Sequence, residues 1–162
     1  MRVLGIDPGL ANTGWGIIQN SVPNEDWEVI DFGSVTTKAR SSTAERLNKI
    51  YTEISGLIRK HSPDVVAVEK IFLGVNAKSA LKVGEARGAV ILAAGDAKLE
   101  VREYTATEIK VALTDYGQAS KEQVQLMVKR FLNLPKIPKP DHAADALACA
   151  YCYAVSNGDL KL

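Results

Sequence analysis

The sequence predicts an α/β fold in which a mixed five-stranded sheet carries helices on both faces. Two observations predict it: the first third of the chain holds three segments with strand character, and two further strand patterns then alternate with helical patterns. With 162 residues, of which 46% are hydrophobic and 24% charged, the chain has the size and composition of a single domain, which we expect to span residues 1–162.

The strand patterns differ in how they bury their residues. The first ends at Asp7-Pro8-Gly9, a strong turn signal, and the first three are expected to form an antiparallel meander. The fourth is a short unbroken apolar run closed by Glu69, which is typical of a strand buried on both faces. The expected strands are residues 2–6, 13–18, 27–35, 65–68 and 99–105.

Five segments show helical periodicity or helix-start signals. Ser120 opens one of them with a capping box, and Val124, Met127, Val128 and Phe131 are expected to point inward from it. Another carries a stripe of mostly small residues that would allow close approach of a neighbouring element or of a partner subunit: Ala77, Ala80, Leu81, Gly84, Gly88 and Ile91. The expected helices are residues 42–60, 76–94, 106–114, a segment beginning at Ser120, and 141–155.

Charge and cysteine content exclude little. The net charge is +1, but no acidic residue lies between Glu122 and Asp141, a segment that is either a solvated surface or a phosphate-binding one and that holds Lys129, Arg130, Lys136 and Lys139. Cys149 and Cys152 fall in an alanine-rich helix, where free cysteine behaves as a small hydrophobe, so neither structural zinc nor a disulfide is expected. The sequence has neither a membrane-spanning run nor a signal-peptide pattern, so we expect a cytoplasmic protein.

Four residues could carry chemistry. Asp7 and Glu69 each end a central strand, and functional groups of α/β sheets gather outside such ends; if the two strands are neighbours, the carboxylates meet. His142 and Asp145, three residues apart, share one face of the last helix. Each also has an ordinary explanation: Asp7 as a turn residue, Glu69 reaching water, His142 as a capping residue, and Asp145 favoured by the helix dipole.

Taken together, these residues predict a divalent metal site. Carboxylates that approach closely repel one another, and a divalent cation removes the repulsion. Carboxylate-rich sites suit Mg²⁺ or Mn²⁺, and the imidazole of His142 shifts the preference toward Mn²⁺. A pair of such ions about 4 Å apart is the arrangement that cleaves phosphodiesters.

The sequence resembles the RuvC-type crossover (Holliday) junction endodeoxyribonucleases in three blocks. The first is Leu4-Gly5-Ile6-Asp7-Pro8-Gly9 with Thr13-Gly14-Trp15-Gly16. The second runs from Val68-Glu69-Lys70-Ile71-Phe72 through Asn76 to Gly88, and the third is Asp141-His142-Ala143-Ala144-Asp145-Ala146-Leu147-Ala148. A lone Gly-Ile-Asp-x-Gly is weak, but three blocks in order over nearly the whole chain are specific.

The resemblance implies a ribonuclease-H-like fold, a homodimer, and paired symmetric nicks in four-way DNA junctions during recombination and repair. It implies 5′-phosphate and 3′-hydroxyl ends, two Mg²⁺ ions per site (Mn²⁺ being the second candidate) and a RuvA–RuvB type branch-migration partner. Asp7 would bridge the metals, with Glu69, His142 and Asp145 as further ligands. His142 falls where many members carry aspartate, which leaves the preferred ion open.

The resemblance also implies DNA contacts. Lys110 and Lys121 match positions near the scissile phosphate, Lys121 having a catalytic role, and the aromatic matching Phe72 works at the junction centre; further contacts are expected from Lys78, Lys82 and Arg87. Without the resemblance, each lysine is explained as an ordinary surface charge, and the Phe72 loop could fold onto the core. Glu85 stands where the family often has glutamine, and nothing in the sequence explains it.

Three alternative functions share parts of this pattern. An actin-like kinase fragment would need a second phosphate loop, and no later Asp-x-Gly follows a strand. A catalytically silent junction-binding protein would be expected to have lost an acidic ligand. A ribonuclease-H-like nuclease acting on another substrate, such as an RNA–DNA hybrid, fits the Phe72 loop and the small-residue helix less well than a junction-cutting dimer does.

Overall fold

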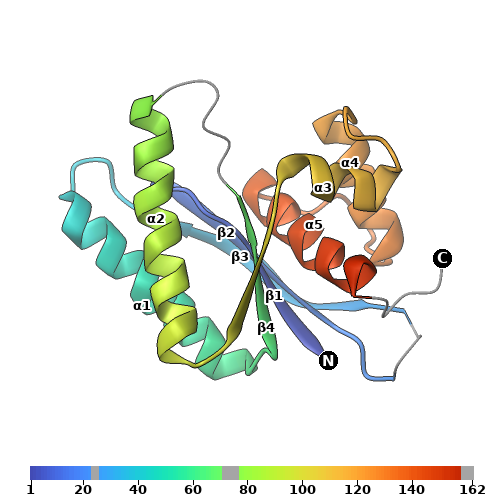
Figure 1. The fold of residues 1–162 in the computed structure, drawn as a ribbon, viewed down its shortest axis with the longest axis horizontal. Helices are drawn as coiled ribbons and strands as arrows, with labels where there is room; N and C mark the ends of the chain where they lie inside the picture. The colour runs from blue at the N-terminus through green and yellow to red at the C-terminus, as the bar shows by residue number, and fades with distance from the viewer. Residues whose placement is uncertain (23–25, 71–76, 158–162) are drawn as a thin grey trace.

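The computed structural model describes residues 1–22, 26–70 and 77–157, and the side chains of Ala77 and Lys78 lie outside the description. Figure 1 shows a central sheet with helices on either side. The strands are β1 (Arg2–Asp7), β2 (Asn12–Gln19), β3 (Glu28–Thr36), β4 (Val65–Glu69) and β5 (Glu100–Tyr104). The helices are α1 (Thr43–His61), α2 (Ala77–Asp96), α3 (Ala106–Thr114), α4 (Lys121–Phe131) and α5 (Asp141–Ser156).

The sheet has the strand order β3-β2-β1-β4-β5. β1, β2 and β3 pair antiparallel, which confirms the expected meander, while β4 pairs parallel with both β1 and β5. The mixed five-stranded sheet predicted from the sequence is therefore confirmed. β1 and β4, the two strands that end in carboxylates, are direct neighbours.

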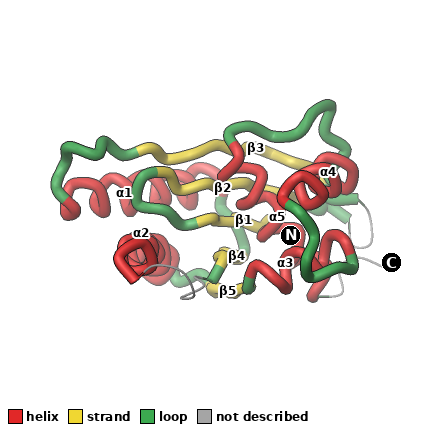
Figure 2. Tube along the Cα trace, turned by 90° about the horizontal axis from the view of Figure 1, so that it is seen from above, coloured by secondary structure: helices red, strands yellow, loops and turns green. Residues whose placement is uncertain are grey.

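Each face of the sheet has its own apolar core. In Figure 2 the pair α1 and α2 lies to one side of the strands, and α3, α4 and α5 lie to the other. Alternate residues of β1 supply the two cores: Val3 packs toward α5, whereas Leu4 and Ile6 pack toward α1 and α2. All residues of β4 before Glu69 are buried, as its unbroken apolar run predicted.

Local signals in the sequence set the helix starts. Ser42, Thr105 and Ser120 each accept a hydrogen bond from the backbone N–H three residues later, and each forms a complete capping box. Ser62, in the left-handed conformation, ends α1 directly after His61. These caps explain why the predicted starts of α1, α3 and α4 lie within about one residue of the observed ones.

Two glycines allow α5 to lie directly on the sheet. A β-carbon on Gly5 of β1 would lie 2.1 Å from the carbonyl oxygen of Ala146, and one on Gly14 of β2 would lie 1.9 Å from that of His142. Real atoms cannot approach so closely, so any side chain at either position would push the helix away. The bare backbone of β1 and β2 thus sets the height of α5 above the sheet.

Three predicted details take a different or more definite form. Met127 and Phe131, expected to point inward, are only partly buried, whereas Val124 and Val128 are buried. The small-residue stripe of α2 does not face the core: Leu81 is 66% exposed and Gly88 is also exposed, because Ala86, Val90, Ala93 and Ala94 form the packed face. Cys149 and Cys152 are buried free thiols.

No helix in the described ranges is long and apolar enough to cross a membrane.

Candidate metal centre

Asp7 and Glu69 lie side by side at one edge of the sheet. The parallel register places Ile6 opposite Val68, so the two carboxylates that follow them end adjacent strands. Side chains alternate along a strand, and because Ile6 and Val68 pack toward α1 and α2, Asp7 and Glu69 point to the opposite face, where α5 lies. The sequence predicted that the two carboxylates meet if their strands are neighbours, and the structure confirms this.

The first turns of α5 bring in the other two residues. His142 Nδ1 lies 2.7 Å from Asp7 Oδ2. One ligand atom from each of Asp7, His142 and Asp145 can be chosen so that all three lie within 4.8 Å of one another. Asp7 and Asp145 are mostly buried, while the side chain of His142 is 45% exposed. Helical spacing on α5 and the glycine contacts beneath it produce this cluster.

Glu69 and two lysines complete the surroundings. A cavity of about 270 Å³ is lined by Asp7, Glu69 and Asp145 together with Lys110 of α3 and Lys121 of α4. Lys121 Nζ donates to Asp145 Oδ2 at 2.8 Å. Glu69 lines this cavity but is not part of the tighter cluster of Asp7, His142 and Asp145. All four predicted ligands and both predicted active-site lysines thus gather at one edge of the sheet.

Burial makes the charged forms of the two strand-end carboxyls unfavourable. Desolvation, reinforced by the charges of Asp7 and Asp145, raises the pKa of Glu69 from 4.5 to about 7. Desolvation also raises the pKa of Asp7, and this effect outweighs the opposing hydrogen bond with His142. Burial alone would lower the pKa of Lys121, but its hydrogen bond with Asp145 and the nearby carboxylates raise it.

These residues fit a divalent cation. Three carboxylates and an imidazole are donors that Mg²⁺ and Mn²⁺ accept, and the raised pKa values of Asp7 and Glu69 reflect first their burial and then the nearby negative charge. Lys121 and His142 each contact one carboxylate but leave Glu69 without a close cationic partner among the ion pairs of the described residues. A cation in the cavity would therefore relieve a repulsion that the chain itself leaves in place.

The remaining predicted DNA-binding residues are more scattered. Lys82 is exposed on α2. Arg87 pairs with Glu103 of β5 through Nη2, 2.5 Å from Oε1, so any contact with DNA would require this pair to open. Phe72 and the side chain of Lys78 lie outside the described residues. Glu85 is half-buried on α2, and the structure gives no reason for it.

Sequence reasoning missed the apolar wall of the cavity. Ala106 and Ile109 of α3, Val124 of α4 and Ala148 of α5 line it alongside the charged groups. By excluding water, this wall produces the desolvation that raises the pKa of Glu69. The helical spacing of Ala106, Ile109 and Lys110 is a signal that could have placed them on one face.

Comparison with known proteins agrees with this geometry. Residues 3–153 match the family "Crossover junction endodeoxyribonuclease RuvC". The chain belongs to the RuvC family. It is 46% identical to the RuvC of Caldicellulosiruptor saccharolyticus over 160 residues, covering 99% of this chain and 96% of that protein. It is 53% identical to the RuvC of Geobacter sulfurreducens over 156 residues, covering 96% and 93% of the two chains.

A solved RuvC structure shares the fold. The structure of Thermus thermophilus RuvC in complex with a Holliday junction substrate matches with a TM-score of 0.91 and 35% identity, covering 97% of this chain and 94% of that one. The fold is thus the ribonuclease-H-like fold of RuvC, as the sequence resemblance implied. The chain is a crossover junction endodeoxyribonuclease, a metal-dependent nuclease of recombination and repair.

Proposed function

We propose that the chain resolves four-way DNA junctions by hydrolysing phosphodiester bonds at the cavity lined by Asp7, Glu69 and Asp145, beside which His142 lies against Asp7. The observation that carries the proposal is the convergence of these four side chains from β1, β4 and α5. The family match covers residues 3–153, which supports one nuclease domain over residues 1–162. Water attacks the phosphorus and the bond to the 3′ oxygen breaks, leaving 5′-phosphate and 3′-hydroxyl ends.

The four side chains are proposed as ligands of Mg²⁺, two ions per site, with Mn²⁺ as the second candidate because of His142. Bound divalent ions lower the pKa of coordinated water and offset charge on the phosphate. Asp7, at the centre of the group, is the proposed shared ligand. The apolar wall of α3, α4 and α5 keeps bulk water from the carboxylates and so strengthens every charge interaction within the cavity.

The two cavity lysines are proposed to hold the scissile phosphate, Lys121 being the catalytic one. Lys121 is the first residue of α4, where free backbone N–H groups already favour an anion. In the absence of DNA its ammonium group is held by Asp145 at 2.8 Å, which aims it into the cavity. The phosphate would compete with Asp145 for this ammonium group.

Further contacts are proposed along the junction arms and at its centre. Phe72, three residues after Glu69 in the sequence, is proposed to stack on a base at the crossover, a contact worth roughly 1–3 kcal/mol. Arm contacts are proposed for Lys78, Lys82 and Arg87, in addition to Lys110 and Lys121. A homodimer would provide two cavities for two cuts, and a branch-migration complex of the RuvA–RuvB type is the proposed partner. Because the substrate is chromosomal DNA, we propose that the protein acts in the cytoplasm.

The proposal is tested with Asp7→Asn on a synthetic four-way junction. We expect cleavage with Mg²⁺ to fall by at least about a hundredfold while junction affinity stays within about threefold, because the substitution removes a metal ligand and no phosphate contact. The matched control is Asp141→Asn: Asp141 is exposed at the start of α5, the helix that carries His142 and Asp145, it pairs with Lys139, and its substitution should leave cleavage within about twofold.

Three substrates and three ionic conditions separate the alternatives. Symmetric nicks in the junction alone, with Mg²⁺ or Mn²⁺ and not with EDTA, support the proposal. Tight junction binding without nicks under any ion would instead indicate a silent junction-binding protein. Cleavage of an RNA–DNA hybrid in preference to the junction would indicate a related nuclease with another substrate. Full activity of Asp7→Asn would contradict the metal assignment.

A further inference from the structure

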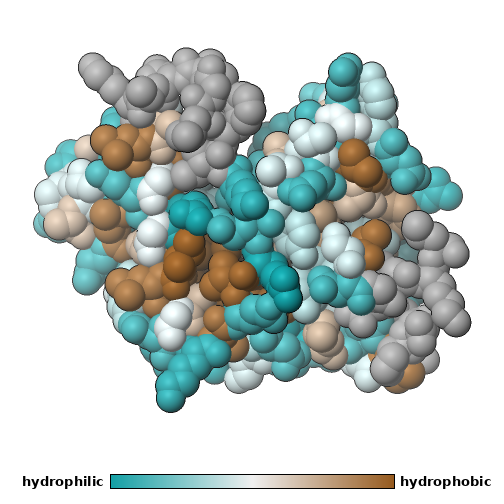
Figure 3. All heavy atoms as spheres, in the orientation of Figure 1, coloured by the Kyte–Doolittle hydropathy of each residue, from teal (hydrophilic) through white to brown (hydrophobic). Residues whose placement is uncertain are grey.

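The outer faces of α3 and α4 enclose an apolar groove that takes no part in the metal centre. Its larger hollow has a volume of about 690 Å³ and lies between α3, α4 and the end of α5. Val111, Tyr116 and Leu126, which line it, are 44%, 56% and 55% exposed, although all three are large apolar or aromatic side chains. Figure 3 shows exposed apolar atoms over this part of the molecule, in addition to those over α2. Exposed groups gathered in a hollow indicate an interaction site.

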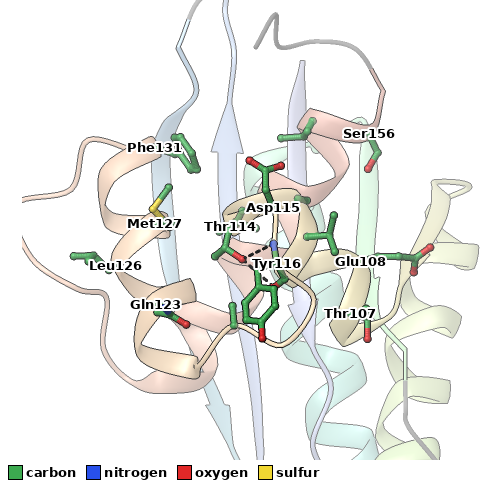
Figure 4. Close-up of a pocket in the computed structure, with 15 residues that line it drawn as sticks. Thr107, Glu108, Thr114, Asp115, Tyr116, Gln123, Leu126, Met127, Phe131 and Ser156 are labelled. Atoms are coloured by element: carbon green, nitrogen blue, oxygen red, sulfur yellow. Dashed lines mark hydrogen bonds between the residues drawn. The ribbon is translucent and has the colours of Figure 1, made fainter.

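A second hollow continues the first across the ridge of α4. It has a volume of about 540 Å³ and shares Leu126 and Met127 with the larger one. In Figure 4 Met127 and Phe131 project from α4 over the larger hollow, with Glu108 and Thr107 of α3 on its far side. The two hollows thus form one groove with leucine and methionine at its middle.

The two ends of the groove carry opposite charges. Among the described residues, the larger hollow is lined by the carboxylates of Glu108 and Asp115 and by no cation. The smaller one is lined by Lys129 and Arg130 and by no carboxylate. A nucleic acid, which is anionic along its whole length, would meet repulsion at the acidic end. A segment with an apolar face, a cationic end and an anionic end matches all three parts.

We propose that this groove docks an amphipathic helix of a partner protein, with a basic end at Glu108 and Asp115 and an acidic end at Lys129 and Arg130. An amphipathic helix lying in an apolar groove is a common mode of peptide recognition, and flexible methionine side chains such as Met127 adapt to it. Binding of a partner protein at this surface would be a function additional to junction cleavage. The surface lies on the reverse of the two helices that carry Lys110 and Lys121 into the metal centre, so a docked partner contacts the catalytic elements without covering the DNA site.

The probe is a fluorescent synthetic peptide of about 16 residues, which makes a helix about 24 Å long. Its leucines follow helical spacing, with glutamates in the first turn and lysines in the last. The control peptide has the same residues reordered so that the leucines share no face. We expect the full-length protein to bind the first peptide at least about tenfold more tightly than the second.

Variants locate the binding. Leu126→Glu should weaken binding at least about tenfold, because it places a charge at the apolar centre of the groove, while Val22→Glu, a matched change at another exposed apolar residue, should not. Asp115→Asn and Arg130→Gln should each weaken binding about two- to fivefold at low salt and less at high salt. Asparagine suits the left-handed backbone of Asp115, so this variant removes charge without disturbing the end of α3.

Other occupants give other results, and each would overturn the proposal. A gain of about tenfold in peptide affinity in Leu160→Glu/Leu162→Glu would assign the groove to the chain's own C-terminal residues. A halved molecular mass in Leu126→Glu would assign it to a second copy. Displacement of the peptide by a four-way junction would assign it to DNA, and unchanged affinity in Leu126→Glu would place the peptide elsewhere.

Discussion

At the scale of single residues, folding works against ionisation of the carboxyl groups in the proposed metal centre. Asp7 and Glu69 are desolvated and near one another, and burial raises the pKa of both carboxyls. In the metal-free protein their charged forms therefore oppose folding. Such a site keeps charge ready for a cation at the expense of the stability of the metal-free protein.

Glu69 should make the metal-free protein less stable as the pH rises. Its pKa is raised from 4.5 to about 7, so its favourable contribution is complete below pH 4.5 and is lost as the pH rises through about 7. From this group the free energy of unfolding should fall by on the order of 3 kcal/mol across that window. Denaturant unfolding in EDTA at a series of pH values measures the change.

Glu69→Gln isolates this effect. The amide cannot ionise, so in EDTA at pH 8 the variant should be more stable than the wild type, although it should cleave junctions at least about a hundredfold more slowly. Glu53→Gln, a change at an exposed glutamate of α1, is the control and should leave the pH profile unaltered. Equal stability of Glu69→Gln and wild type at pH 8 would show that the ionised Glu69 carboxylate does not destabilise the metal-free protein.

The sequence predicted which residues gather at this site, but it did not predict which of them form hydrogen bonds or ion pairs with one another. Asp7, Glu69, His142 and Asp145 could be named because strand ends and helical spacing are local signals. The ion pair between Lys121 and Asp145 joins residues 24 positions apart on different helices, and no local pattern encodes it. The ion pair between Arg87 and Glu103 was not predicted, for the same reason.

At the scale of elements, the decisive contact is that of α5 with bare strand backbone. Gly14 lies opposite Asp7 in the register of β1 and β2, directly beneath the carbonyl of His142. One glycine therefore sets the distance between Asp7 on the sheet and His142 on the helix, the two proposed metal ligands. Packing against α5 explains Gly5, Gly14 and Gly16 of the first sequence block, whereas a β-carbon on Gly9 would meet the carbonyl oxygen of Asn12 within the turn.

Gly14→Ala should separate the two halves of the metal centre. Its β-carbon would lie 1.9 Å from the His142 carbonyl oxygen, so α5 must move outward. We expect a loss of about 1–3 kcal/mol in the free energy of unfolding and at least about a tenfold loss of cleavage, with a higher Mg²⁺ concentration needed for half-maximal activity. Thermal unfolding and metal titration of cleavage measure these changes.

Gly95→Ala is the matched control for that substitution. A β-carbon at Gly95 on α2 meets nothing within 4 Å, so alanine should stabilise the helix by about 0.5–1 kcal/mol without changing metal dependence. If Gly14→Ala kept the wild-type metal dependence, α5 would not be positioned by this contact.

Elements were predicted where their signals are local. Capping boxes and apolar periodicity fixed the helices of this chain closely, and alternation fixed the strands. The sequence predicted a mixed five-stranded sheet but not the order of its strands, because pairing of β1 with β4 depends on residues about 60 positions apart. The outer groove escaped prediction because Met127 and Phe131 fit an inward-facing pattern, yet pack only partly against the core.

At the scale of the whole molecule, a second exposed apolar surface among the described residues lies on α2. Leu81 and Leu92 are 66% and 57% exposed, and Gly88 between them is also exposed. Figure 3 shows apolar atoms gathered over α2 and the neighbouring sheet edge. The small-residue stripe predicted from the sequence therefore lies on a surface that another copy can approach closely.

Leu81→Glu should convert a dimer into monomers. Sedimentation at micromolar concentration should give twice the chain mass for the wild type and the single mass for the variant, because two buried glutamates would face one another across a twofold axis. Leu126→Glu, an equivalent change on α4, should keep the dimer. A wild-type monomer, or a dimeric Leu81→Glu, would contradict the assignment of α2 to the interface.

Cleavage products add a readout that mass alone lacks. A symmetric pair of cuts requires two cavities related by the symmetry of the junction, and each chain has one. A monomeric Leu81→Glu keeps Asp7, Glu69 and both lysines in place, so it should still nick, but on one strand at a time. In a plasmid-borne junction the wild type should release linear product, whereas the variant should accumulate nicked circles, since its two cuts are no longer made within one complex.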